Sequence, residues 1–266
     1  MTTLPLDSVF NLWTIFLLVL VRITGMFFLS PIFGRRNLPN YYKVGFCFMF
    51  SLIVAQSVPV IDLSAYTSLA SYAVLIGKEL LIGLMLGYIS YMVFTSIYIA
   101  GQMIDMRIGF GMVSVFDPIT NIQIPISADF YVVFATLMML VTDSHHLLIQ
   151  AMVESFTLLP LGQAEFSGVL LKQVVELFTQ VFVIGFKIAA PVTAVILITD
   201  LALGIVSKSM PQLNVFQLGM PIKIIIGLAV IMITLGTFRG VVHVIMQGTY
   251  EEIYKFFIQA RPGGGS

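Results

Sequence analysis

Long blocks of apolar residues, separated by short segments rich in proline and glycine, dominate this sequence. The first block, residues 12–29, contains a single charged residue, Arg22. A block of this length can cross the bilayer core, which is about 30 Å thick, as a helix. Only 10% of the 266 residues are charged and 59% are hydrophobic, whereas about a quarter of residues are charged in soluble domains. We therefore predict an all-α protein of the membrane class.

Composition and motifs exclude several other classes. The chain has 13 basic and 13 acidic residues and no basic arm or RNA-binding signature, so we expect no nucleic-acid partner. One cysteine, Cys47, excludes a disulfide framework and a metal site made only of cysteines. His145 and His146 point in different directions on a helix, and no HExxH or GxSxG motif accompanies them. We expect no metal, no cofactor and no enzymatic activity.

The apolar blocks predict helices, and the breaks between them predict turns. Asp7 stands where the basic region of a signal peptide would lie, so we expect the first helix to be retained. Pro191 is expected to kink or divide the longest block. Six independent spans would place both termini outside the cytoplasm by the positive-inside rule. The expected helices are 9–29, 44–61, 72–100, 127–141, 163–206 and 222–246, with a mixed segment at 143–162 and an amphipathic tail at 247–260.

Charges inside the first and third helices predict helix packing. Arg22 costs several kcal/mol against lipid unless it is paired, so its face should meet protein. Lys78 and Glu79 lie near the start of the third helix, where Gly83 and Gly87 share a face that another helix can approach closely. Glu79 shares that face, so the close contact should end there or meet a polar partner. We favour a packing surface over a binding pocket.

Two further charges, Lys187 and Asp200, lie in the block that contains Pro191. A broken helix with buried charges can mark the ion site of a secondary transporter. The same residues can instead face a neighbouring subunit. We favour subunit packing, and the transporter is the alternative.

Residues 101–125 are predicted to be irregular, because Gly109, Gly111 and Pro118 cannot continue a plain helix. Hydrocarbon cannot satisfy open backbone groups, and the side chains of this segment are too apolar for an ordinary exposed loop. We therefore predict irregular backbone that protein shelters beside a passage. A second irregular segment, residues 207–221, is predicted to form a turn before the last helix.

Three motifs point to one family: SPIFGRRNLP at 30–39, GFGMVSVFDP at 109–118 and MPQLNVFQLGMPIK at 210–223. Together they resemble the FliR family of flagellar type III secretion export-gate proteins, whose injectisome relatives are called SctT. The resemblance runs from the first helix to about residue 260, and its third motif looks more flagellar. That third motif contributes Pro211, Gln212, Asn214, Phe216, Gly219, Pro221 and Lys223.

The resemblance implies a core subunit of the export gate in the bacterial inner membrane, at the flagellar basal body. One copy would assemble with about five FliP-like and about four FliQ-like subunits into a helical cone, much of it above the bilayer plane. FlhB-like and FlhA-like export components and unfolded flagellar proteins would be further partners. The helices would form hairpins packed on neighbouring subunits, which conflicts with six independent spans. Residues 1–260 would be one helical domain, and 261–266 a linker, left from cloning or leading into a fused domain.

The family's plug, a loop that projects into the closed channel, falls on about residues 110–126. Bulky side chains there can occlude a narrow pore, and methionine adds deformability. Asp117, which precedes Pro118, is expected to fix a turn rather than to bind an ion. The plug residues implied by the resemblance are Phe110, Gly111, Met112, Val113, Phe116, Asp117 and Pro118.

Overall fold

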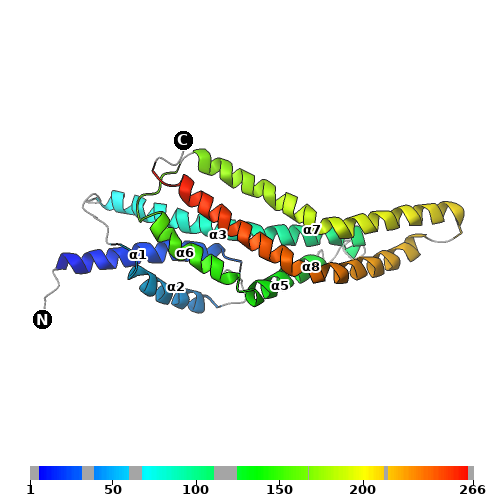
Figure 1. Ribbon diagram of the computed structural model, residues 1–266, viewed down its shortest axis with the longest axis horizontal. Coiled ribbons are helices and arrows are strands. Elements are labelled where there is room, and N and C mark those ends of the chain that lie inside the picture. Colours follow the sequence, from blue (N-terminus) through cyan, green and yellow to red (C-terminus); the bar gives the residue numbers. More distant parts are fainter. Residues whose placement is uncertain are drawn as a thin grey trace, which may run out of the picture. The chain divides into compact units, whose positions relative to one another are not determined.

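The computed structural model describes residues 6–31, 39–59, 68–110, 125–166, 168–212 and 215–262, and side chains are described from residue 11 and, in the last range, from residue 217. Helices make up nearly all of these ranges, and no strand occurs in them, so the all-α prediction is confirmed (Figure 1). The helices are α1 (Leu6–Leu29), α2 (Asn40–Ala55), α3 (Leu69–Ile108), α5 (Ile126–Val141), α6 (His145–Leu158), α7 (Gly168–Ser209) and α8 (Val215–Gln259).

The helices form two compact units. The first unit comprises Met1–Met92, His145–Glu176 and Met246–Ser266, and the second comprises Val93–Ser144 and Leu177–Ile245. Each of the three longest helices, α3, α7 and α8, therefore contributes one part to each unit.

Aromatic and aliphatic side chains fill the first unit. The Phe16 ring of α1 lies 5.3 Å from the Phe48 ring of α2, and Phe27 lies 5.2 Å from Phe46. Cys47, between these α2 rings, is buried and free, as expected for a small apolar side chain. Burial of such rings supplies most of the stabilisation that a helical unit gains from packing.

The predicted amphipathic tail is the last part of α8, and it packs inside the first unit. Ile253, Phe256 and Phe257 are buried. The backbone N–H of Glu165 donates to the carbonyl oxygen of Ala260 at 3.0 Å, which joins the end of the tail to the segment before α7. The tail therefore covers its apolar face with residues of its own chain.

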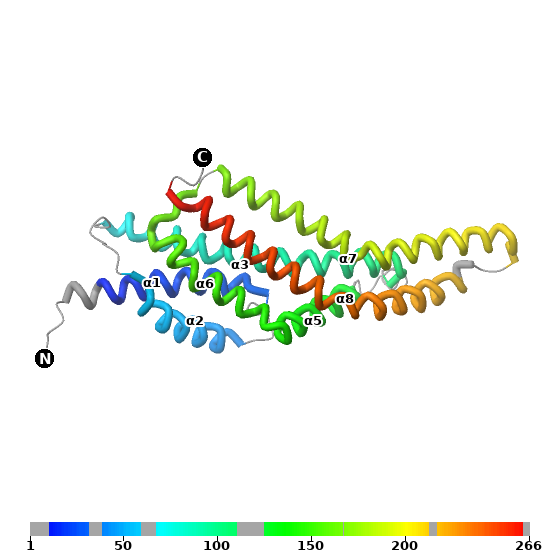
Figure 2. Tube along the Cα trace, in the orientation of Figure 1, coloured from blue at the N-terminus to red at the C-terminus, as the bar shows by residue number. Residues whose placement is uncertain are grey.

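The second unit packs α5 and α7 against α8 and α3. Phe238 of α8 lies 5.2 Å from the Tyr131 ring and 5.5 Å from the Phe134 ring of α5. At Gly185 of α7, an added Cβ would lie 3.0 Å from the carbonyl oxygen of Ser96 in α3. Glycine thus permits close approach of these helix backbones. The later part of α7 and the earlier part of α8 run side by side (Figure 2), and an ion pair between Asp200 and Lys223 joins them.

The prediction that irregular backbone starts at Gly101 was wrong, because residues 101–108 continue α3. Gly101 serves packing there: its Cβ position is occupied by Ala128 of α5. The helix ends where Gly109 adopts a φ of 104°, a conformation that favours glycine. Residues 111–124 lie outside the described part of the chain.

Pro191 and Pro221 both lie inside helices. Pro191 does not divide α7, which continues to Ser209, and Pro221 lies six residues after the start of α8. The predicted turn at 207–221 was therefore wrong for residues 207–209 and 215–221. Each proline removes one backbone N–H from the helical ladder. The remaining ladder and the packing of neighbours such as Val192 and Ile196, both fully buried, are sufficient to keep α7 continuous.

Six independent spans are not found in the described residues. Four helices, α1, α3, α7 and α8, are long and apolar enough to cross a membrane, and the bent pair α5 and α6 would make a fifth span. The predicted second span fails because α2 has only 16 residues, about 24 Å at 1.5 Å per residue. The orientation derived from six spans loses its basis with them.

Candidate functional site

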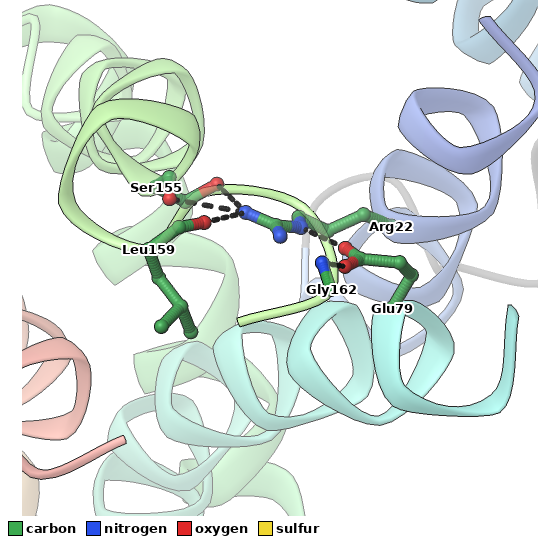
Figure 3. Close-up of polar contacts among 5 residues, drawn as sticks. All are labelled: Arg22, Glu79, Ser155, Leu159 and Gly162. Atoms are coloured by element: carbon green, nitrogen blue, oxygen red, sulfur yellow. Dashed lines mark hydrogen bonds and ion pairs between the residues drawn. The ribbon is translucent and has the colours of Figure 1, made fainter. Parts of the chain in front are cut away.

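A buried ion pair joins α1 to α3 in the first unit. The Nε of Arg22 donates to Oε2 of Glu79 at 2.6 Å, and both side chains are 0% exposed (Figure 3). Arg22 therefore meets protein, as its position in an apolar block required. Glu79 is the polar partner that the glycine-bearing face of α3 was expected to need.

The same guanidinium binds the C-terminal end of α6. Its Nη1 donates to the carbonyl oxygens of Ser155 and Leu159, at 3.0 Å each (Figure 3). The guanidinium Cζ also lies over the Phe156 ring, 4.5 Å from its centroid. The last carbonyls of a helix lack intrahelical donors and carry partial negative charge. The positive charge of Arg22 therefore compensates both the negative charge of Glu79 and the partial negative charge at the end of α6.

Glu79 in turn holds the turn that follows α6. Its Oε1 accepts a hydrogen bond from the backbone N–H of Gly162 at 2.8 Å, and Gly162 has a φ of 81° (Figure 3). Both carboxylate oxygens are thus used. Among the described residues, only Nη2 of Arg22 is left without a hydrogen-bond partner in this network.

Small residues bring the backbones of α1 and α3 together beside the ion pair. A Cβ at Gly87 would lie 2.7 Å from the carbonyl oxygen of Met26, and one at Gly25 would lie 3.0 Å from that of Leu80. Gly83 faces the carbonyl group of Arg22 itself. This contact sets the depth at which Arg22 reaches Glu79.

The arrangement is structural in its chemistry. Two buried charges gain little net stability as a pair, but removal of one partner costs about 3–5 kcal/mol because the other is left uncompensated. Arg22 and Glu79 form hydrogen bonds with each other and with backbone groups of α6 and of the turn that follows it. The ion pair fixes how three helices meet.

The other predicted charges are not buried within the chain. Lys78 is half-buried and has no hydrogen bond or ion pair among the described residues. The broken helix that the ion-site alternative needs is absent, because α7 is continuous through Pro191. Lys187 lies on an exposed face of α7 in the single chain. Asp200 is 38% exposed and forms an ion pair with Lys223 of α8. Lys187 and Asp200 therefore do not form one site.

The third motif is divided between the α7–α8 turn and the start of α8. Gly219 is buried, and a Cβ there would lie 3.2 Å from Cδ1 of Leu203 in α7. Pro211 and Gln212 are exposed in the turn, and Pro221 is exposed on α8. Phe216 lies in the first turn of α8 by its backbone, and Asn214 lies outside the described residues.

Most of the plug motif lies outside the described part of the chain. Phe110 is half-buried in the turn after α3. Gly111, Met112, Val113, Phe116, Asp117 and Pro118 lie outside the described part of the chain.

Sequence reasoning missed the role of Asp105. Its carboxylate is buried and accepts the backbone N–H of Ser127 at the start of α5. Pro125, which cannot cap a helix with its side chain, directly precedes α5. A proline at this position is the one sequence signal that the first N–H groups of α5 need a hydrogen-bond acceptor from elsewhere in the chain.

Large apolar faces of α7 and α8 are uncovered in the single chain. Within the most apolar window of each helix, only 28% of α7 and 17% of α8 is buried. Exposed side chains on these faces include Leu171, Phe186, Leu201, Ile225, Met232 and Ile233. Exposed large apolar side chains in such numbers are typical of contact with lipid or other proteins.

The family model of bacterial export proteins, family 1, matches residues 13–249. A flagellar biosynthetic protein FliR from Bacillus subtilis is 35% identical over 256 residues, which is 92% of this chain and 95% of that protein. The FliR protein of Aquifex aeolicus is 28% identical, with 91% of each chain covered. The Escherichia coli protein is 26% identical, with 79% of this chain and 80% of that protein covered. The chain therefore belongs to family 1 of the bacterial export proteins, as a member of the FliR family of flagellar biosynthetic proteins.

Proposed function

We propose that this chain is a non-enzymatic core subunit of the flagellar type III protein export gate in the bacterial inner membrane. It helps to form and to close the channel through which unfolded flagellar proteins leave the cytoplasm. Family membership over residues 13–249 supports this role, as does similarity to flagellar biosynthetic proteins along nearly the whole chain.

The observation that carries the proposal is the length of the uncovered apolar helices. α7 and α8 have 42 and 45 residues, or about 63 and 68 Å at 1.5 Å per residue. The hydrocarbon core is about 30 Å thick, so lipid can cover only about half of either helix. The end of α8 packs on residues of its own chain. The exposed apolar surface of α7 and α8 that lipid does not reach needs protein neighbours, which favours a subunit of an assembly whose cone extends above the bilayer plane.

FliP-like and FliQ-like subunits, about five and about four per copy of this chain, are the neighbours implied by the family. FlhB-like and FlhA-like components and unfolded flagellar proteins complete the proposed partners. Affinity purification of the tagged chain from membrane extracts should recover two other small hydrophobic proteins in an unequal ratio. Recovery of the chain alone, as a stable monomer, would contradict the assembly.

The plug is the second part of the proposal. The connecting segment between α3 and α5 contains the plug motif, whose bulky side chains would block a narrow channel. Deletion of residues 112–116 should make the assembled gate leak ions or small molecules in planar bilayers. An unchanged conductance would refute the plug while leaving the subunit role intact.

The ion-coupled transporter has no support in the structure. Its two charges, Lys187 and Asp200, are 13 positions apart on α7, and Pro191 does not divide that helix.

Complementation tests the function directly. In a Bacillus subtilis strain without its own FliR protein, this chain should restore secretion of flagellar proteins into the medium and swimming. The native protein is the positive control, and the chain truncated before α8 is the negative control. Transport of a small solute by the purified chain alone in vesicles would overturn the proposal.

A further inference from the structure

Asp105 joins two helices across the segment that contains the plug motif. It lies in the last turn of α3 and is only 5% exposed. Its Oδ1 and Oδ2 accept the backbone N–H of Ser127 at 3.0 and 3.1 Å. Ser127 is the second residue of α5. A single carboxylate thus connects the end of one helix to the beginning of the next.

The bond replaces a missing cap. The first N–H groups of a helix have no intrahelical acceptor, and the residue before the helix usually supplies one. Here that residue is Pro125, whose side chain has no acceptor atom and makes no cap bond, so the acceptor comes from Asp105. The charge of Asp105 also faces the positive end of the α5 dipole, where an anion is stabilising.

A second contact lies one turn earlier on α3. The Cβ position of Gly101 coincides with the backbone of Ala128, and Ala128 is fully buried. The backbones of α3 and α5 therefore touch at Gly101, and the hydrogen bond of Asp105 follows on the same face. Two adjacent contacts of this kind leave little freedom for the helices to separate or slide.

We propose that Asp105 is a positioning residue that fixes the separation between the end of α3 and the start of α5. Both ends of the connecting segment then start from one rigid base, which is formed by Gly101, Asp105, Ser127 and Ala128. The functional consequence of this role rests on the proposed plug. We expect the resting leak of the assembled gate to depend on Asp105, although Asp105 lies outside the plug motif.

The test compares three variants of the full chain in the assembled, purified complex. Asp105→Ala removes the acceptor, and a helix cap is worth about 1 kcal/mol, so amide exchange in the first turn of α5 should rise roughly fivefold. The resting conductance in planar bilayers should rise with it. Asp105→Asn keeps one acceptor oxygen and should restore part of both properties. Ser127→Ala is the matched control, because the bond uses the backbone N–H and should survive.

Separate outcomes bear on the plug and on Asp105. A leak from the 112–116 deletion, together with wild-type conductance and exchange in Asp105→Ala, overturns the role of Asp105 and leaves the plug intact. If the 112–116 deletion leaves the resting conductance unchanged, the plug is refuted. The rate of amide exchange at the start of α5 in Asp105→Ala then decides the role of Asp105. Equal increases in conductance and amide exchange in Ser127→Ala and Asp105→Ala would also overturn the role of Asp105.

If Asp105→Ala does not assemble, Asp105→Asn decides. Loss of the carboxylate charge at the start of α5 should speed exchange there by roughly two- to fivefold. Exchange at the wild-type rate in this variant would overturn the proposal.

Discussion

The carbonyl oxygen of Arg22 occupies the place where a Cβ of Gly83 would lie. The backbones of α1 and α3 are therefore in direct contact one turn away from Glu79. This proximity lets the Arg22 side chain reach Glu79 on one side and the end of α6 on the other. The glycine contact and the ion pair are two parts of one helix junction.

Gly83→Ala should destabilise the chain by roughly 1–3 kcal/mol, because the backbones must move apart to admit a methyl group. Thermal unfolding of the detergent-solubilised protein would measure the loss. Gly77→Ala, in the same helix, is the matched control: its Cβ meets nothing within 4 Å, and alanine is the better helix former by roughly 0.5–1 kcal/mol. Equal effects of the two substitutions would argue against the close contact.

Glu79→Gln should destabilise the chain by about 3–5 kcal/mol, because it leaves the Arg22 guanidinium buried without a compensating charge. The amount of folded protein in membranes and its thermal midpoint in detergent should both fall. Lys78→Gln, at the neighbouring and half-buried position, should change neither by much.

A double variant, Arg22→Met with Glu79→Gln, separates burial of charge from packing. Removing both charges should recover a large part of the stability lost in Glu79→Gln, since no uncompensated charge remains. If the double variant is as unstable as the sum of the single variants, the two residues do not act as a pair.

Tyr250 provides a smaller test of how the end of α8 is held in the first unit. Its hydroxyl donates to Oε2 of Glu154 in α6 at 2.5 Å. Tyr250→Phe should lower the free energy of unfolding by about 1 kcal/mol, the usual net value of one hydrogen bond. The measurement is the thermal midpoint in detergent, which should fall. Tyr254→Phe is the control, because the Tyr254 hydroxyl has no hydrogen bond in the described part of the chain; a midpoint equal for both variants would contradict the role of Tyr250.

The sequence predicted the fold class and most helix positions because an apolar block in a membrane-class chain has few alternatives to a helix. It did not predict the continuity of α7 and α8. Pro191 and Pro221 are strong local signals for a break, but each removes only one hydrogen bond from a helix of more than 40 residues. Gly101 misled for a related reason, since it marks a packing contact and not a helix end.

The partnership of Arg22 with Glu79 was partly predictable. A lone arginine in an apolar block requires a partner, and Glu79 shares a helix face with Gly83. The bonds from Arg22 to α6 were not predictable, because backbone carbonyls carry no sequence signal. Asp105 was hidden for the same reason: its partner is the backbone N–H of Ser127, 22 residues away.

Asp200→Asn should leave protein export nearly unchanged, and so should Lys187→Gln. Asp200 and Lys223 form a partly exposed pair, and pairs of this kind contribute about 0–1 kcal/mol. Lys187 is exposed on a different part of α7. In a gate the cargo moves without a bound ion at these positions, whereas an ion-coupled transporter would lose transport when its carboxylate is neutralised. Secretion of flagellar proteins by complemented cells measures this, with Glu79→Gln as the variant expected to fail. Loss of secretion in Asp200→Asn, at normal levels of folded protein, would show that this carboxylate takes part in transport.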